Sequence, residues 1–213
     1  MLREAVALYT DMGRLNMAAR QLREIAEAED KAGRKAEAAA SYEQAADLFA
    51  TENAASEAGR CRLRVAELLS LELGDYARAG AIFEEIGRAA ADNNLLRFGA
   101  RGHLLCAGIC AMCHLPDSDV ATRIERYRDA DPQFSGSREA ALLEGCAAAL
   151  AACDDAAFSQ AVAEFDGMTR LDAWKTAALL RVKRRIGARQ KGEERPGGGG
   201  GGGGDGDDDD EVL

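Results

Sequence analysis

Apolar side chains recur at steps of three and four residues along most of the chain, as at Ile82, Ile86 and Ala89. This spacing is typical of an amphipathic α-helix, which places such residues on one face. Ala, Leu, Glu and Arg, which favour helices, dominate the sequence up to residue 191. Glycine-containing turns interrupt the pattern at residues 11–14, 31–34 and 73–75. The pattern predicts an all-α chain of helices joined by short turns, the last three near residues 137–152, 156–165 and 170–190.

Two of the expected helices repeat one another. Residues 33–48 align with residues 74–89, and small, aromatic and acidic positions stay in register: Ala36 with Ala77, Tyr42 with Phe83, and Glu43 with Glu84. Small residues let paired helices approach closely, and such repeats are typical of tetratricopeptide-like helix hairpins. We therefore expect a right-handed superhelix of hairpins, an α-solenoid, over residues 1–135. A C-terminal helical bundle is expected over residues 136–191.

The formal charge of −10 is distributed unevenly along the chain. Residues 193–213 carry a net charge of −7 and 9 of the 23 glycines, eight of which are consecutive at 197–204. The remaining body has a net charge of only −3. Glycine-rich segments of this kind behave as flexible linkers. We expect a linker over residues 192–206 and an acidic tail over residues 207–213, both outside the fold.

Composition excludes several classes of protein. Aromatic residues make up 5% of the chain, which argues against an all-β domain and against stacking platforms for nucleic acid. The basic run at residues 181–191 lacks aromatic residues and is followed by acid, so we interpret it as a helix C-terminus favoured by cations. No nucleic-acid partner is expected. Without a membrane-length apolar stretch or a signal peptide, we expect a cytoplasmic protein with reduced cysteines.

One cluster contains residue types that bind zinc. Cys106, Cys110 and Cys113 lie close to His103 and His114 in the sequence. On one helix, however, the three cysteines form a single stripe, where a core helix places small apolar side chains. We expect buried structural thiols, no metal and no cofactor. These two histidines are the only ones, and no glycine-rich phosphate loop precedes a Lys-Ser/Thr pair, so an enzyme is not expected.

Several motifs occur in a fixed order along the chain. They are Tyr-Thr-Asp-Met-Gly-Arg at 9–14, Tyr-Glu-Gln-Ala-Ala-Asp at 42–47, Phe-Ser-Gly-Ser-Arg-Glu at 134–139 and Arg-Leu-Asp-Ala-Trp-Lys-Thr at 170–176. As a set they resemble the alpha-type soluble NSF attachment proteins (alpha-SNAP), over residues 1 to about 190. The resemblance covers the C-terminal two thirds of that family, and the N-terminal helices with their membrane-attachment loop have no counterpart. Because residues 2–9 read like the second half of a hairpin, we expect that residues upstream are missing.

The resemblance implies an adaptor, not an enzyme. Family members lie along the four-helix SNARE bundle, recruit the hexameric ATPase NSF and stimulate it. Such a protein is cytoplasmic and meets membranes peripherally, through the SNAREs. The family binds SNAREs through basic residues on the concave face, and the matching positions are Arg14, Arg20, Arg60, Arg64, Arg97, Arg101 and Arg138. The acidic positions that match the family's NSF contacts, with the terminal leucine, are Asp154, Asp155, Asp207, Asp208, Asp209, Asp210, Glu211 and Leu213.

The residues themselves support part of this interpretation. Arg60 and Arg64, like Arg97 and Arg101, are four apart and share one helix face, and the planar guanidinium can bind both oxygens of a carboxylate. For any single arginine, a solvated helix face is the alternative. For the whole chain, the alternative is a generic peptide-binding scaffold or chaperone adaptor without NSF coupling. The glycine insertion, and alanines where the family has Glu after Ala147, predict weaker NSF coupling.

Overall fold

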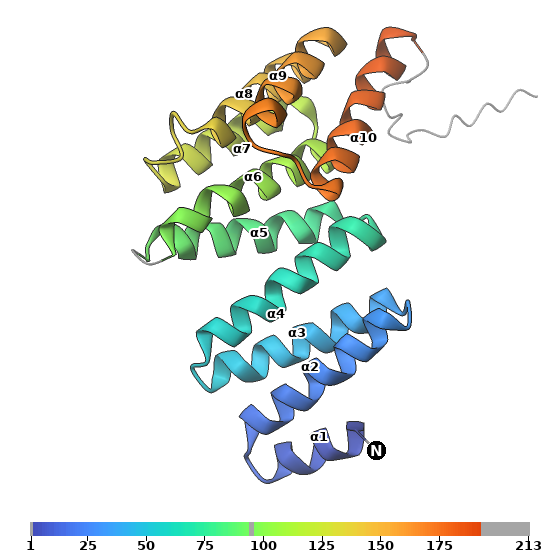
Figure 1. The fold of residues 1–213 in the computed structure, drawn as a ribbon, viewed down its shortest axis with the longest axis vertical. Coiled ribbons are helices and arrows are strands. Elements are labelled where there is room, and N and C mark those ends of the chain that lie inside the picture. The colour runs from blue at the N-terminus through green and yellow to red at the C-terminus, as the bar shows by residue number, and fades with distance from the viewer. Residues whose placement is uncertain (1, 94–95, 193–213) are drawn as a thin grey trace, which may run out of the picture.

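The computed structural model describes residues 2–93 and 96–192, which form ten α-helices and one short π-helix (Figure 1). The helices are α1 (Leu2–Asp11), α2 (Leu15–Lys31), α3 (Lys35–Thr51), α4 (Ala55–Leu68), α5 (Tyr76–Ala91), α6 (Arg97–His114), α7 (Asp117–Ala130), α8 (Arg138–Ala151), α9 (Asp155–Met168) and α10 (Ala173–Gln190). The π-helix η1 (Leu69–Leu73) continues α4. The prediction of an all-α solenoid is confirmed.

Consecutive helices pack as hairpins that stack from α1 to α9, and α10 packs across α6 and α9 (Figure 1). Ion pairs join alternate helices: Arg23 of α2 lies 2.6 Å from Glu57 of α4, Arg78 of α5 lies 2.6 Å from Glu43 of α3, and Arg123 of α7 lies 2.9 Å from Glu84 of α5. The solenoid therefore has two sides. We call α2, α4, α6 and α8 the even layer and α3, α5 and α7 the odd layer.

The predicted repeat is present in the structure. Helices α3 and α5 start at the equivalent residues Lys35 and Tyr76, and their aromatic residues Tyr42 and Phe83 are both buried. The connection after α4 differs from the plain turn expected at residues 73–75. There the chain forms η1, and Gly74 closes it with a φ of 68°, a left-handed conformation that favours glycine.

Glycine sets the closest helix contacts. A Cβ atom added at Gly87 of α5 would lie 2.9 Å from Leu104 Cδ2 of α6, and one added at Gly108 of α6 would lie 2.3 Å from Leu143 Cδ1 of α8. Both distances are shorter than van der Waals contact, so α5, α6 and α8 approach at a separation that only glycine permits. The spacing within the even layer thus depends on a residue without a side chain.

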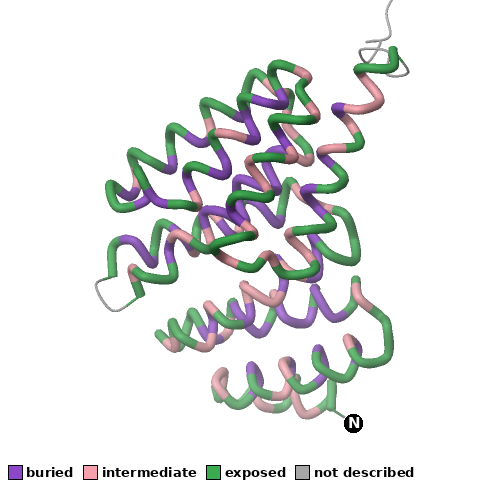
Figure 2. Tube along the Cα trace, turned by 45° about the horizontal axis from the view of Figure 1, so that its top comes forward, coloured by how far each residue is buried: buried purple, intermediate pink, exposed green. Residues whose placement is uncertain are grey.

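The core is continuous from Ala19 in α2 to Ile186 in α10. Figure 2 shows buried positions recurring along the stacked helices, whereas α1 contains no buried residue. The proposed division between residues 135 and 136 stays a prediction. The predicted linker over 192–206 and the tail over 207–213 lie, from residue 193 onward, outside the described residues.

Helix α10 begins later than predicted and ends at the expected residue, Gln190. It begins at Ala173 because the carboxylate of Asp172 accepts a hydrogen bond from Lys175 N at 2.8 Å, a helix N-cap, so residues 170–172 precede the helix. At the other end, the basic run does more than complement the helix dipole. Arg185 donates to Asp117 Oδ1 at 2.7 Å and Arg189 pairs with the same carboxylate, so both arginines attach α10 to the start of α7.

Candidate functional site

The seven arginines singled out from the sequence share one layer of the solenoid. Each belongs to the even layer: Arg14 is the N-cap residue of α2, Arg20 lies in α2, Arg60 and Arg64 in α4, Arg97 and Arg101 in α6, and Arg138 is the first residue of α8. Arginines separated by more than 120 residues in the sequence are therefore distributed along one side of the stack.

A groove of about 380 Å³ separates α2 from α4. Its lining consists of Arg23, Glu27, Tyr42, Arg60, Cys61 and Arg64. Tyr42 and Cys61 are buried, so they form the floor, whereas the side chain of Arg60 is 68% exposed. The groove therefore has a closed floor and a charged rim.

Glu57 holds two arginines at this rim. Its Oε2 lies 2.6 Å from Arg23 Nη1, and its Oε1 lies 2.7 Å from Arg60 Nη2. One carboxylate thus bridges two guanidinium groups, and Glu27, whose Oε1 lies 3.8 Å from Arg23 Nε, balances the second positive charge. Arg23 was not singled out from the sequence, although it lies one helical turn after Arg20 on the same face of α2.

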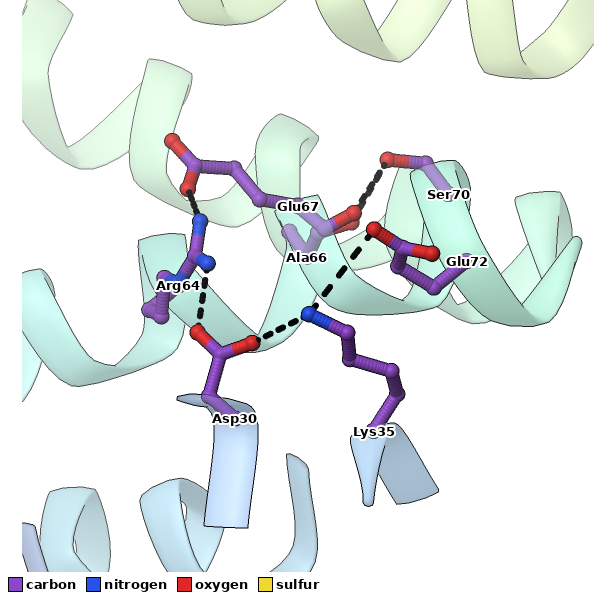
Figure 3. A network of polar contacts seen from close by, with 7 residues as sticks. All are labelled: Asp30, Lys35, Arg64, Ala66, Glu67, Ser70 and Glu72. Carbon is purple, nitrogen blue, oxygen red and sulfur yellow. Dashed lines mark hydrogen bonds and ion pairs between the residues drawn. The ribbon is translucent and has the colours of Figure 1, made fainter. Parts of the chain in front are cut away.

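Arg64 belongs to a second network, drawn in Figure 3. Its guanidinium donates to Asp30 Oδ2 at 2.6 Å and to Glu67 Oε2 at 2.7 Å, while Lys35 Nζ donates to the other oxygen of Asp30 at 2.6 Å. The hydrogen bonds that Lys35 and Arg64 donate to Asp30 lower the pKa of this carboxyl, and the one that Arg64 donates to Asp30 raises the pKa of Arg64. Arg64 links α4 to α2 with its charge balanced, so it has less capacity for an acidic partner than its sequence position indicates.

The other five arginines have a different environment. Arg14, Arg20 and Arg138 are exposed and Arg101 is half-buried, and none of the four has an ion pair among the described residues. Arg97 Nε donates to the carbonyl oxygen of Ala91 at 3.1 Å, a contact that leaves its charge uncompensated. The positive charge of the even layer that has no carboxylate partner is therefore concentrated on these five side chains.

The two described acidic candidates also differ in whether they have an ion pair. Asp154 caps α9, with its carboxylate accepting from Ala157 N at 2.9 Å, and it remains exposed. Asp155 lies 3.6 Å from Lys183 Nζ of α10. The remaining acidic candidates at residues 207–211 and Leu213 lie outside the described residues.

The cysteine stripe of α6 is part of the core. Cys106 and Cys110 are buried, and Cys113 is half-buried. Burial raises the pKa of the Cys106 thiol to about 12 and that of Cys113 to about 11. All three side chains are therefore neutral thiols at physiological pH, as expected from the stripe. No group of three or more metal-binding side chains occurs within the described residues.

Comparison with known proteins shows which family this chain belongs to. The family model described as "Soluble NSF attachment protein, SNAP" matches residues 1–187. The chain belongs to the SNAP family.

Relatives in this family come from distant organisms. The chain is 43% identical to the alpha-soluble NSF attachment protein of Vitis vinifera over 193 residues, which cover 91% of this chain and 66% of that protein. It is 35% identical to the human alpha-soluble NSF attachment protein over 186 residues, covering 87% and 62%. A probable vesicular-fusion protein sec17 homolog of Schizosaccharomyces pombe is 32% identical over 185 residues, covering 85% and 63%. The chain thus spans slightly less than two thirds of the length of these SNAP relatives. In the part of the chain that is described, no helix is long and apolar enough to cross a membrane.

Proposed function

We propose that this chain is a non-enzymatic adaptor that binds assembled SNARE complexes through its even layer and recruits and stimulates the ATPase NSF. The family membership supports a role in vesicle fusion. The observation that carries the SNARE contact is the set of arginines without ion pairs, Arg14, Arg20, Arg101 and Arg138, spread over α2, α6 and α8. An elongated acidic helical bundle is a matching partner for such a row of charges. The protein would then act in the cytoplasm and meet membranes through the SNAREs.

The elongated shape of the layer matters for this contact. Charges spaced along one side steer an oppositely charged partner and fix its register more than they raise affinity. Guanidinium groups that have no intramolecular carboxylate can form bidentate contacts without first breaking an ion pair. We therefore assign the main role to the unpaired arginines, a supporting role to Arg60 and Arg97, and the smallest to Arg64.

Charge reversal on the even layer tests the SNARE contact. Arg20→Glu combined with Arg138→Glu changes two exposed side chains on two helices, and we expect loss of binding to assembled SNARE complex in a pull-down. The matched control is Arg34→Glu with Arg126→Glu, which changes the net charge equally at two exposed positions at α3 and in α7, in the odd layer. Equal binding by both double variants, with unchanged circular dichroism, would refute the assignment.

The acidic groups test the NSF contact separately. Removing residues 207–213 should lower the SNARE-dependent stimulation of NSF ATPase while SNARE binding is retained. Asp154→Asn should act in the same direction, because asparagine preserves the helix cap and removes only the charge. A chain that binds SNARE complexes or other peptides but never changes NSF turnover would instead support the generic scaffold.

A further inference from the structure

A second groove, of about 290 Å³, lies between α9 and α10, away from the α2–α4 groove. Most of its lining is apolar and includes Phe158, Val162, Leu171, Leu179 and Leu180. Leu180 is 44% exposed, although it lies in the middle of α10. The groove is therefore an apolar surface that the described part of the chain leaves partly uncovered.

The rim of this groove is charged. Lys183 lines it, and Arg184 follows as an exposed side chain with no ion pair among the described residues. Two carboxylates also lie nearby, and both have cationic partners: Asp155 lies 3.6 Å from Lys183, and Asp166 lies 3.9 Å from Arg170. Arg184 is thus the cation beside the groove that keeps its charge without a carboxylate partner among the described residues, which favours an acidic ligand with an apolar end.

The last residues of the chain have this chemistry. Asp207, Asp208, Asp209, Asp210 and Glu211 are followed by Val212 and Leu213. An acidic run followed by two branched apolar residues matches an apolar groove that lies beside the unpaired Arg184.

The chain length also fits. Lys183 lies seven residues before Gln190, the last residue of α10, or about 10 Å along the helix at 1.5 Å per residue. Thr176, at the far end of the groove, lies about 21 Å from the same point. Val212 lies twenty positions after Gly192, and a glycine-rich chain of that length has a root-mean-square end-to-end distance of about 25 Å. The tail is therefore long enough to reach the part of the groove that α10 lines.

We propose that the C-terminal tail docks in cis into the groove between α9 and α10. Val212 and Leu213 contact the apolar lining near Leu180, and the acidic run lies beside Lys183 and Arg184. While it is docked, the tail is not available to other proteins, and a competing partner must displace it from the groove. The contact needs no second protein, so it stands or fails independently of the proposed NSF and SNARE roles.

A competition experiment with the full chain tests the docking. A fluorescent peptide with the sequence of residues 205–213 is titrated with the wild type and with a Val212→Ser/Leu213→Ser variant, and binding is followed by anisotropy. An intramolecular tail has an effective concentration in the millimolar range. With an intrinsic Kd of about 100 µM, it would occupy the groove to about 90% and weaken the peptide about tenfold. We therefore expect the variant to bind the peptide about tenfold more tightly than the wild type.

Groove variants locate the binding site. In the Val212→Ser/Leu213→Ser background, Leu180→Asp should abolish peptide binding, and the exposed Arg184→Glu should weaken it several-fold. Leu8→Asp is the matched control, since Leu8 is 63% exposed in α1 at the opposite end of the solenoid and its change should leave binding intact. The proposal is overturned if the wild type and the tail variant bind the peptide equally or not at all. It is also overturned if groove variants that retain native circular dichroism bind normally, or if light scattering shows that the tail joins two copies.

Discussion

The contact of Gly108 with Leu143 yields a quantitative prediction about what sets the separation of α6 and α8 in the even layer. In most exposed helices, replacing glycine by alanine stabilises by about 1 kcal/mol, because alanine has the higher helix propensity. At Gly108 the new Cβ would lie 2.3 Å from Leu143 Cδ1 and 2.8 Å from Leu143 Cδ2. Leu143 is fully buried, so it cannot move aside into solvent. Overpacking of this kind costs about 1–3 kcal/mol, so we expect Gly108→Ala to destabilise by about 1 kcal/mol in net terms.

The same helix contains the matched control. Gly102 is exposed, and a Cβ added there meets no atom within 4 Å, so Gly102→Ala should stabilise by about 1 kcal/mol. For a domain of this size, 1 kcal/mol corresponds to about 2–4 °C in Tm. Thermal unfolding followed by circular dichroism should therefore raise Tm for Gly102→Ala and lower it by a similar amount for Gly108→Ala. Equal increases in both variants would show that the α6–α8 spacing does not depend on the missing side chain.

Three further predictions concern buried or paired groups. Asp30→Asn should lower the free energy of unfolding by about 1–2 kcal/mol at pH 7, because Arg64 and Lys35 both lose the carboxylate that joins them, although Arg64 keeps Glu67. The pKa of Asp30 is lower in the folded protein than in the unfolded chain. The difference in unfolding free energy between wild type and variant, measured by urea denaturation, should therefore persist above pH 4 and vanish as the pH falls through the pKa of folded Asp30. A difference that stays constant with pH would contradict the prediction. Cys106, with a pKa of about 12, should react with Ellman's reagent only after unfolding, and rapid reaction in the native state would place it at the surface. Asp117→Ala should increase the proteolytic cleavage of α10 near Arg185, whereas an unchanged cleavage rate would mean that the ion pairs do not hold this helix end.

The hairpin architecture was predictable because it depends on local pattern. The spacing of small and aromatic residues that aligned Tyr42 with Phe83 is determined within one repeat, and both side chains are buried in equivalent helices. The seven arginines were chosen from the family resemblance, and the structure places all of them at helices of the even layer. Apart from the glycine at position 74, nothing in the sequence indicated the π-helix at Leu69–Leu73. The spacing of apolar residues there is the same as at the end of an ordinary α-helix.

The ion pairs were not predictable in the same way. Asp30 and Arg64 are 34 residues apart, and Asp117 and Arg185 are 68 apart, so each pair forms only when nonadjacent helices pack. From their spacing of four residues, Arg60 and Arg64 were predicted to be equivalent residues on one helix face. In the structure, Arg60 shares one carboxylate with Arg23, whereas Arg64 contacts two carboxylates.

This division of the arginines has a consequence for any acidic partner of the even layer. An arginine already held by a carboxylate must exchange one ion pair for another, so it contributes little net free energy to binding. An arginine that is exposed and unpaired gives up only hydration. The salt dependence of binding should therefore follow Arg20 and Arg138 rather than Arg64, whose loss would weaken the link between α2 and α4 instead. Within one layer, then, the position of the nearest carboxylate determines whether an arginine is held in an intramolecular ion pair or stays available to an acidic partner.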